Sequence, residues 1–215
     1  MSEGKKLSIL GDSISTYKDV SNDVNSNHTI GDNPYFYMDP FPIGKTYWMQ
    51  IAEKFGLNIC VNNSWSGGNL SGKEDQYSGL NRACQLSDNN GEIPDFIIVF
   101  MGINDLGRGV DLQIFSSDYE KTLKIIKEKY PLASVCCVNL PDRFPFFKRQ
   151  TEKFNEAIYN AASAAGENFF VADLFNSRLN NEVYYNNTVD GLHPDEDGMK
   201  MIAEVVEKAI ADNIG

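Results

Sequence analysis

The chain has 215 residues, a formal net charge of -11, 42% hydrophobic residues and 23% charged residues, which is the composition of an ordinary soluble globular protein. Its negative charge repels phosphate backbones and anionic membrane surfaces, and no run of Lys and Arg forms a local exception, so neither a nucleic-acid partner nor membrane insertion is expected. The length allows one sizeable core, and we predict a single domain over residues 1–215.

Short apolar runs alternate with helical patterns along the chain, which is typical of βα units around a parallel sheet. Each predicted strand is short and continuously apolar, as a strand covered on both faces should be. The pattern predicts strands over residues 6–10, 57–61, 96–101, 135–140 and 169–172.

The helical patterns between these strands carry recognisable end signals. Gly56 and Gly166 are typical C-terminal caps, and Pro194 suits the first turn of the last helix. The segment 20–44 has no periodicity and is crowded with Asn, Asp, Pro and aromatic residues, which indicates a long functional loop. The predicted helices cover residues 46–55, 117–130, 148–165 and 194–210, with a weaker one over 80–86.

The N-terminus leads into the first apolar run without an apolar signal segment, and no stretch approaches membrane-spanning length. As given, the chain is therefore expected to be cytoplasmic. A secreted or periplasmic protein whose signal peptide had been removed would have the same appearance.

Polar motifs follow three of the predicted strands, and a further one precedes the last helix. Ser13 comes after the first strand, Gly67 after the second and Asn104 after the third, while Asp190 and His193 lie just before the last helix. In an open parallel sheet, the loops at the carboxyl ends of the strands converge on one crevice. We therefore expect residues from opposite ends of this chain to meet there.

These residue types suit an acyl-transfer site. A serine hydroxyl is a weak nucleophile until an imidazole accepts its proton, and His193 is a better candidate than His28, which lies in a polar Ser/Asn stretch. Asp190 lies three residues before His193, so one tight turn can bring its carboxylate to the imidazole. The pattern predicts Ser13 as nucleophile, His193 as base and Asp190 as the orienting acid.

Two further residues suit stabilisation of an oxyanion. Gly67 has no Cβ, so its backbone can approach a substrate and leave an N–H pointing at the oxyanion. Asn104 offers a neutral side-chain donor. Each motif by itself also suits a structural role, because Gly-Asp-Ser is a common turn, Asp190 could cap a helix, and the Asn and Asp after Gly102 are favoured where a strand ends.

In this order, the four motifs resemble the SGNH hydrolases, also called GDSL-type esterases and lipases. They are Gly11-Asp12-Ser13, Asn62 to Asn69, Gly102-Ile103-Asn104-Asp105 and Asp190-Gly191-Leu192-His193. The chain departs from the family where Ser15 stands in place of a common leucine, and where the segment 14–45 replaces an immediate helix; both departures concern substrate choice.

The resemblance implies a three-layer α/β/α sandwich, flavodoxin-like, with a mostly parallel five-stranded sheet. It implies a serine esterase that acts through an acyl-enzyme and needs no metal or cofactor. The Ser13 and Gly67 backbone N–H groups and the Asn104 side chain would form the oxyanion hole, with Gly68 as the alternative to Gly67.

The substrate prediction rests on aromatic residues. The loop 20–44 places Tyr35, Phe36 and Tyr37 beside many amide and carboxylate groups, which suits a sugar better than a long acyl chain. We therefore predict short-chain acyl esters, chiefly acetyl esters of carbohydrate, with Tyr35, Tyr37 and Trp65 in substrate binding.

Other activities share part of this pattern. A lysophospholipase or thioesterase, or an acyltransferase with a sugar acceptor, would use the same site. A metallophosphoesterase would need several His and Asp ligands, and only two histidines exist in the chain. A carbohydrate-binding domain without catalysis would keep the aromatic loop but would have no use for the four ordered motifs.

Overall fold

Five parallel strands form one sheet in the order β2-β1-β3-β4-β5. The structure is a computed structural model that describes residues 4–18, 35–38, 40–142, 147–179 and 181–214. The central strand β3 is buried along its whole length, as its unbroken apolar run predicts. The strands are β1 (Lys6–Gly11), β2 (Asn58–Ser64), β3 (Phe96–Phe100), β4 (Ser134–Val138) and β5 (Phe169–Ala172).

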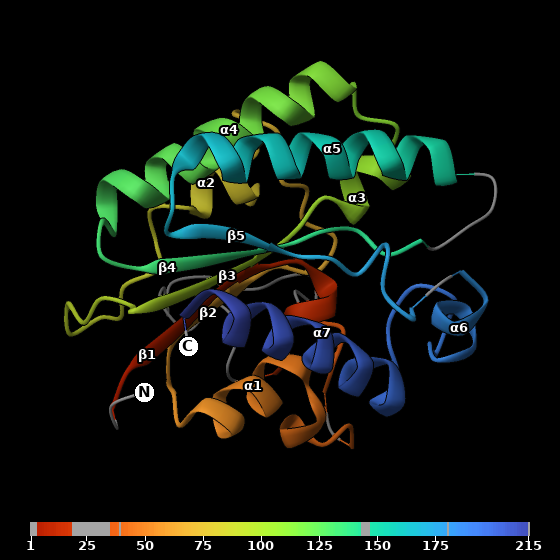
Figure 1. Ribbon diagram of the computed structural model, residues 1–215, viewed down its shortest axis with the longest axis horizontal. Coiled ribbons are helices and arrows are strands. Elements are labelled where there is room, and N and C mark those ends of the chain that lie inside the picture. Colours follow the sequence, from red (N-terminus) through yellow and green to blue (C-terminus); the bar gives the residue numbers. More distant parts are fainter. Residues whose placement is uncertain (1–3, 19–34, 39, 143–146, 180, 215) are drawn as a thin grey trace.

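Helices cover both faces of this sheet (Figure 1). One face carries α2 (Gly79–Arg82), α3 (Ile103–Gly107), α4 (Leu112–Lys129) and α5 (Lys148–Ala165). The other carries α1 (Tyr47–Phe55) and α7 (Glu196–Ile214), which pack against each other. The strand order and the three layers confirm the predicted flavodoxin-like α/β/α fold.

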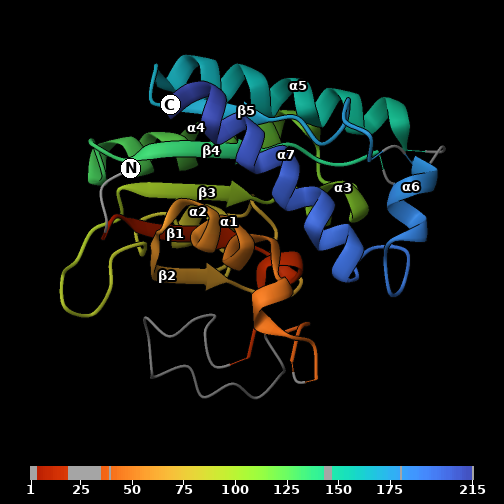
Figure 2. The same ribbon diagram turned by 60° about the horizontal axis from the view of Figure 1, so that its bottom comes forward.

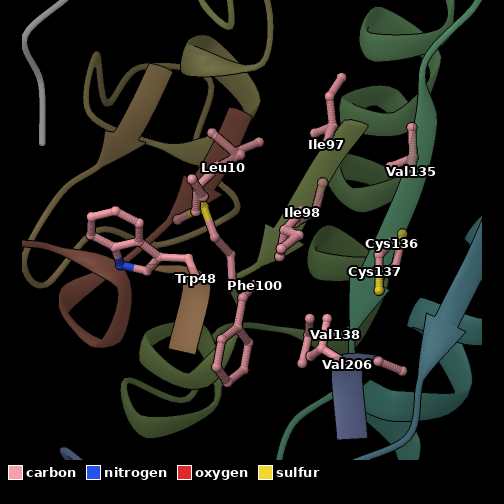
Figure 3. Packing of buried hydrophobic residues seen from close by; sticks show 14 of the residues in the cluster. Leu10, Trp48, Ile97, Ile98, Phe100, Val135, Cys136, Cys137, Val138 and Val206 are labelled. Atoms are coloured by element: carbon pink, nitrogen blue, oxygen red, sulfur yellow. The ribbon is translucent and has the colours of Figure 1, made fainter. Parts of the chain in front are cut away.

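The core joins the sheet to both helical layers. Figure 3 shows Leu10, Phe100 and Val138 of the sheet in one cluster with Trp48 of α1 and Val206 of α7. All of these side chains are almost completely buried. Burial of each such side chain favours folding by about 1.5–3 kcal/mol, so the apolar strands hold the layers together and fix the positions of the strand ends.

The predicted elements agree with the structure except near some of their ends. Helix α5 and strand β5 have the predicted bounds, whereas α4 begins at Leu112, five residues before the predicted start at 117. The carboxylate of Asp111 explains this earlier start, because it accepts hydrogen bonds from the N–H groups of Gln113 and Ile114.

The last helix begins later than predicted. Pro194 was expected in its first turn, but it forms an isolated antiparallel bridge with Thr188, and the helix starts at Glu196. Asp195 caps this start, since its carboxylate accepts from the N–H of Gly198 at 2.9 Å. The chain therefore stays extended just after His193, which keeps that side chain outside the helix.

The glycine cap of α1 was predicted correctly, because Gly56 adopts the left-handed conformation at φ 63°. Four short elements were not predicted, because segments of this length carry no periodicity. They are the 3-10 helices η1 (Ser13–Ser15) and η2 (Ile43–Lys45) and the helices α3 and α6 (Asn181–Asn186).

All strands point toward the same edge of the sheet, where η1, α3 and the first turns of α7 lie (Figure 2). This edge collects the loops that follow β1, β2 and β3. In the part of the chain that the structure describes, no helix has both the length and the apolar character needed to cross a bilayer.

Candidate active site

Ser13 lies in η1, the single turn that directly follows β1. The carboxylate of Asp12 caps this turn by accepting from the N–H of Ile14 at 3.0 Å. A Cβ on Gly11 would lie 2.5 Å from the Cβ of Ser15, so only glycine lets the strand turn this sharply. The turn holds the Ser13 side chain at the carboxyl edge of the sheet, where it is 3% exposed.

The fold brings Ser13, His193 and Asp190 into one line of contacts. The Ser13 Oγ lies 2.9 Å from His193 Nε2, and His193 Nδ1 lies 2.7 Å from an oxygen of Asp190. The other Asp190 oxygen accepts from the backbone N–H groups of Leu192 at 3.0 Å and His193 at 2.8 Å. The tight turn expected from the three-residue spacing is therefore present.

Asp190 determines which imidazole nitrogen carries the proton. Burial by itself would raise the pKa of the Asp190 carboxyl, but hydrogen bonds from His193 and Leu192 lower this pKa below its ordinary value. Asp190 is thus ionised at neutral pH and can only accept hydrogen bonds. In neutral imidazole the proton lies on Nδ1, which leaves Nε2 free to accept from the Ser13 hydroxyl.

The loop after β2 presents a free backbone donor. Gly67 adopts the left-handed conformation at φ 72°, where a side chain would be strained. The N–H of Gly68 donates to the carbonyl of Trp65 at 3.0 Å, whereas the N–H of Gly67 has no acceptor among the described residues. Of the two glycines considered from the sequence, Gly67 is therefore the one whose N–H is available to a ligand.

Asn104 lies in the first turn of α3 and reaches the loops that follow β1 and β2. Its side-chain nitrogen donates to the carbonyl of Gly68 at 3.0 Å and lies 3.4 Å from an Asp12 oxygen. The Asn104 amide therefore lies between the residues that adjoin Ser13 and Gly67. This proximity follows from the shared edge of the sheet, as the sequence pattern predicted.

Asp12 is an ionisable group directly before Ser13 to which the sequence analysis assigned no chemical role. Burial raises its pKa to about 7, partly offset by the hydrogen bond from Ile14 and by the nearby Arg82 charge. Asp12 is only 1% exposed. Any pH profile of activity therefore has to distinguish the ionisation of Asp12 from that of His193.

Arg82 is a buried cation that the sequence reasoning missed. Its guanidinium donates to the carbonyls of Gly11 at 3.0 Å and Tyr77 at 2.8 Å, and also to the carbonyl of Asn63. Burial lowers the pKa of Arg82 to about 10, so it remains charged at neutral pH. Arg82 thereby joins the carboxyl ends of β1 and β2, and its place within a weak helical pattern gave no signal of this role.

The residues predicted to bind substrate lie in different environments. Tyr37 is buried, and its hydroxyl donates to the carbonyl of Pro194 at 2.7 Å, which does not favour the predicted contact with substrate. Trp65 is partly exposed and stacks on Tyr77 with ring centroids 3.9 Å apart. Tyr35 is partly buried. Of the predicted loop 20–44, residues 20–34 and 39 lie outside the described residues.

Ser15 differs from the leucine common at this position, and its side chain faces the protein interior. Its side chain is completely buried, and its hydroxyl lies 2.7 Å from that of Tyr47 in α1. The substitution therefore concerns packing below the turn. Across the described ranges, no three His, Cys, Asp or Glu side chains gather in a way that could hold a metal ion.

Residues 9–201 match the GDSL-like Lipase/Acylhydrolase family, a span that includes all four sequence motifs. The chain belongs to this family. It is accordingly a GDSL-type hydrolase of ester bonds, as its motifs predicted. No protein with a curated description matches the sequence.

Solved structures of other proteins share the fold of this GDSL-type hydrolase. A Bacteroides ovatus protein described as a GDSL-like lipase is 21% identical, with a TM-score of 0.71 over 99% of this chain and 100% of its own. A family 3 carbohydrate esterase of Clostridium thermocellum is 16% identical, with a TM-score of 0.65 over 98% of this chain and 96% of its own.

A family two carbohydrate esterase of Clostridium thermocellum, solved in complex with cellohexaose, is also similar. It is 16% identical, with a TM-score of 0.71, and the match covers 98% of this chain and 65% of that protein. At these identities, the likeness concerns the fold of the GDSL-type hydrolase.

Proposed function

We propose that this protein hydrolyses short-chain acyl esters, chiefly acetyl esters of carbohydrate, with Ser13, His193 and Asp190 as its catalytic triad. The observation that carries the proposal is the continuous line of contacts from the Ser13 hydroxyl through both imidazole nitrogens to the Asp190 carboxylate. Nucleophile, base and orienting acid have these relations in serine hydrolases of unrelated folds.

In the first step, the Ser13 Oγ attacks the ester carbonyl carbon while its proton moves to His193 Nε2. Asp190 stabilises the imidazolium that forms and keeps the ring in the required orientation. The imidazolium then returns the proton to the departing alcohol oxygen, which leaves an acyl group on Ser13. In the second step, His193 takes a proton from water as the water oxygen attacks the acyl carbon. The imidazolium then returns this proton to Ser13 Oγ as the bond to the acyl group breaks, which releases the acid and restores the hydroxyl.

The negative charge on the carbonyl oxygen requires donors. The N–H groups of Ser13 and Gly67 and the side-chain amide of Asn104 are our candidates. The contact of Asn104 with Gly68 and its approach to Asp12 support this assignment, because they bring the amide beside both backbone donors. The backbone donors need no reorganisation as the charge develops, whereas the Asn104 amide has to exchange its 3.4 Å contact with Asp12 for the oxyanion.

The preference for short acyl groups and sugars rests on the surroundings of Ser13. Polar groups surround the turn, including the Asp12 carboxylate and the Asn104 amide, whereas a long acyl chain would need a continuous aliphatic wall. The partly exposed Trp65 lies in the same loop as Gly67 and stacks on Tyr77, which places aromatic rings of the kind that sugars contact beside the proposed oxyanion donor. The carbohydrate esterases among the structural neighbours are consistent with this substrate class.

Acyl-chain length provides the direct test of substrate. With p-nitrophenyl esters of two to twelve carbons, we expect kcat/KM to be highest for acetate and to fall steadily as the chain lengthens. Acetylated xylan and acetylated monosaccharides should release acetate in parallel assays. Faster turnover of dodecanoyl esters or lysophospholipids would contradict the substrate class and leave the triad assignment intact.

The pH dependence should report the base. We expect kcat/KM to rise with pH along one ionisation, because the base has to be neutral to accept the Ser13 proton. Asp190 should add no step near neutrality, because its lowered pKa keeps it ionised there. A rate that stays flat from acid to neutral pH would argue against a histidine base.

The buried Asp12 needs a control in this experiment, because burial raises its pKa to about 7, so that its own ionisation would also appear in the profile. The variant Asp12→Asn keeps an oxygen acceptor for the N–H of Ile14 but cannot ionise. Whatever its absolute rate, it should retain the acid limb of the profile. Loss of that limb in the variant would assign the ionisation to Asp12.

A further inference from the structure

Phe36 covers one face of the His193 imidazole. The two rings are stacked, with centroids 3.5 Å apart and planes inclined by 9°. The ring nitrogens of His193 are already engaged by Asp190 and Ser13, so these contacts act in the plane of the ring. The contact with Phe36 acts perpendicular to that plane and opposes tilting of the imidazole.

The backbone of Phe36 is attached to the turn of the nucleophile. Its N–H donates to Thr16 Oγ1 at 2.9 Å, and the Thr16 hydroxyl donates to the carbonyl of Ser13 at 2.8 Å. Thr16 is completely buried, which protects both bonds from water. The N–H of Lys18 donates to the carbonyl of Tyr37 at 3.0 Å and adds a second connection between the two segments.

The neighbouring Tyr37 contacts the backbone next to the histidine. Its hydroxyl donates to the carbonyl of Pro194, the residue directly after His193, at 2.7 Å. Phe36 and Tyr37 therefore contact both the imidazole ring and the backbone beside it. Their two ring planes are inclined by 78°, so they restrain His193 from different directions.

These contacts form a closed ring of interactions. It runs from the Ser13 hydroxyl to His193, across the stacked rings to Phe36, through the N–H of Phe36 to Thr16, and back to the carbonyl of Ser13. Because the ring is closed, Ser13 and His193 cannot shift relative to each other without weakening one of its contacts. Proton transfer depends steeply on this relation, since small misplacements of reacting groups cost large factors in rate.

We propose that Phe36 is a positioning residue that holds the imidazole of His193 in line with Ser13. The inference rests on the proposed role of His193 as base. The aromatic face also suits the charge that His193 acquires when it accepts the proton, because the ring quadrupole attracts a cation. A flat aromatic ring is therefore required at this position, and a branched aliphatic side chain of similar size should not replace it.

The test uses steady-state kinetics with p-nitrophenyl acetate on Phe36→Leu, Phe36→Ala and Phe36→Tyr. We expect kcat to fall about tenfold in the leucine and alanine variants with KM within about twofold of the wild type, and to recover in the tyrosine variant. The matched control is Phe41→Leu. It alters a nearby aromatic ring whose centroid lies 4.8 Å from that of Tyr37, and this variant should keep the wild-type kcat.

A double-mutant cycle separates positioning from a general structural effect. If Phe36 acts through His193, Phe36→Leu should have no further effect on the residual rate of His193→Ala. Thermal unfolding of each variant verifies that it is folded. If Phe36→Ala does not fold, Phe36→Leu still provides the test. A wild-type kcat in Phe36→Leu, or an unchanged tenfold loss in the His193→Ala background, would overturn the inference.

The same set of variants distinguishes this inference from the proposed function. Full activity in His193→Ala would show that His193 is not the base, and both proposals would fail together. Loss of activity in His193→Ala with wild-type kinetics in Phe36→Leu would leave the triad standing and reject only the role of Phe36.

Discussion

Replacement of Ser13 by alanine should abolish ester hydrolysis, with kcat reduced by roughly 10⁴- to 10⁶-fold. The variant lacks the oxygen that we propose forms the acyl-enzyme, and no other hydroxyl is expected to substitute for it. The measurement is turnover of p-nitrophenyl acetate, supported by mass spectrometry of the protein during reaction. Wild-type protein should gain an acetyl group on Ser13, and the variant should gain none there.

The same variant should remain folded. Removal of the Ser13 hydroxyl leaves His193 Nε2 without its 2.9 Å partner, a loss of about 0.5–1.5 kcal/mol. In a protein of this size, that corresponds to a decrease in melting temperature of a few degrees, about 2–4 °C per kcal/mol. Loss of activity can therefore be separated from loss of structure.

Ser15→Ala is the matched control for Ser13→Ala. Ser15 lies in the same turn, is equally buried and also loses one hydrogen bond, the one to Tyr47 at 2.7 Å. We expect lower stability but near wild-type turnover. If Ser13→Ala keeps more than a few per cent of the wild-type kcat, Ser13 is not the nucleophile.

Asn104→Ala should lower kcat by about 10²–10³-fold while KM changes little. A side-chain donor to the oxyanion strengthens its hydrogen bond only as negative charge develops, so its loss affects the transition state more than substrate binding. The measurement is a full Michaelis–Menten analysis with an acetyl ester. A change confined to KM would assign Asn104 to substrate binding.

The control for Asn104→Ala has to account for the structural contact of this side chain with the Gly68 carbonyl. Asn63→Ala provides it, because Asn63 is a buried amide at the end of β2 that donates to the carbonyl of Gln85 at 3.0 Å. This variant loses that bond and a 3.4 Å contact with Arg82, and its kcat should stay within a few-fold of the wild type. A similar loss in both variants would point to disturbance of the loops.

The sequence by itself determined the sheet and the identity of the site motifs. Continuously apolar segments can be satisfied only by burial on both faces, so the strands were predictable without knowledge of their neighbours. The spacing of Asp190 and His193 and the place of Ser13 after a strand are likewise local. Contact between Ser13 and His193 could be expected because parallel strands bring their following loops to one edge.

Only the tertiary structure decided how the surrounding side chains are used. Phe36 and Tyr37 are adjacent aromatic residues, yet one stacks on His193 while the other directs its hydroxyl to Pro194. Arg82 is buried only because carbonyl groups from two separate strand ends and a loop converge on it. Such environments depend on segments that are distant in the chain. The local sequence does not indicate which distant segment will pack against a given side chain.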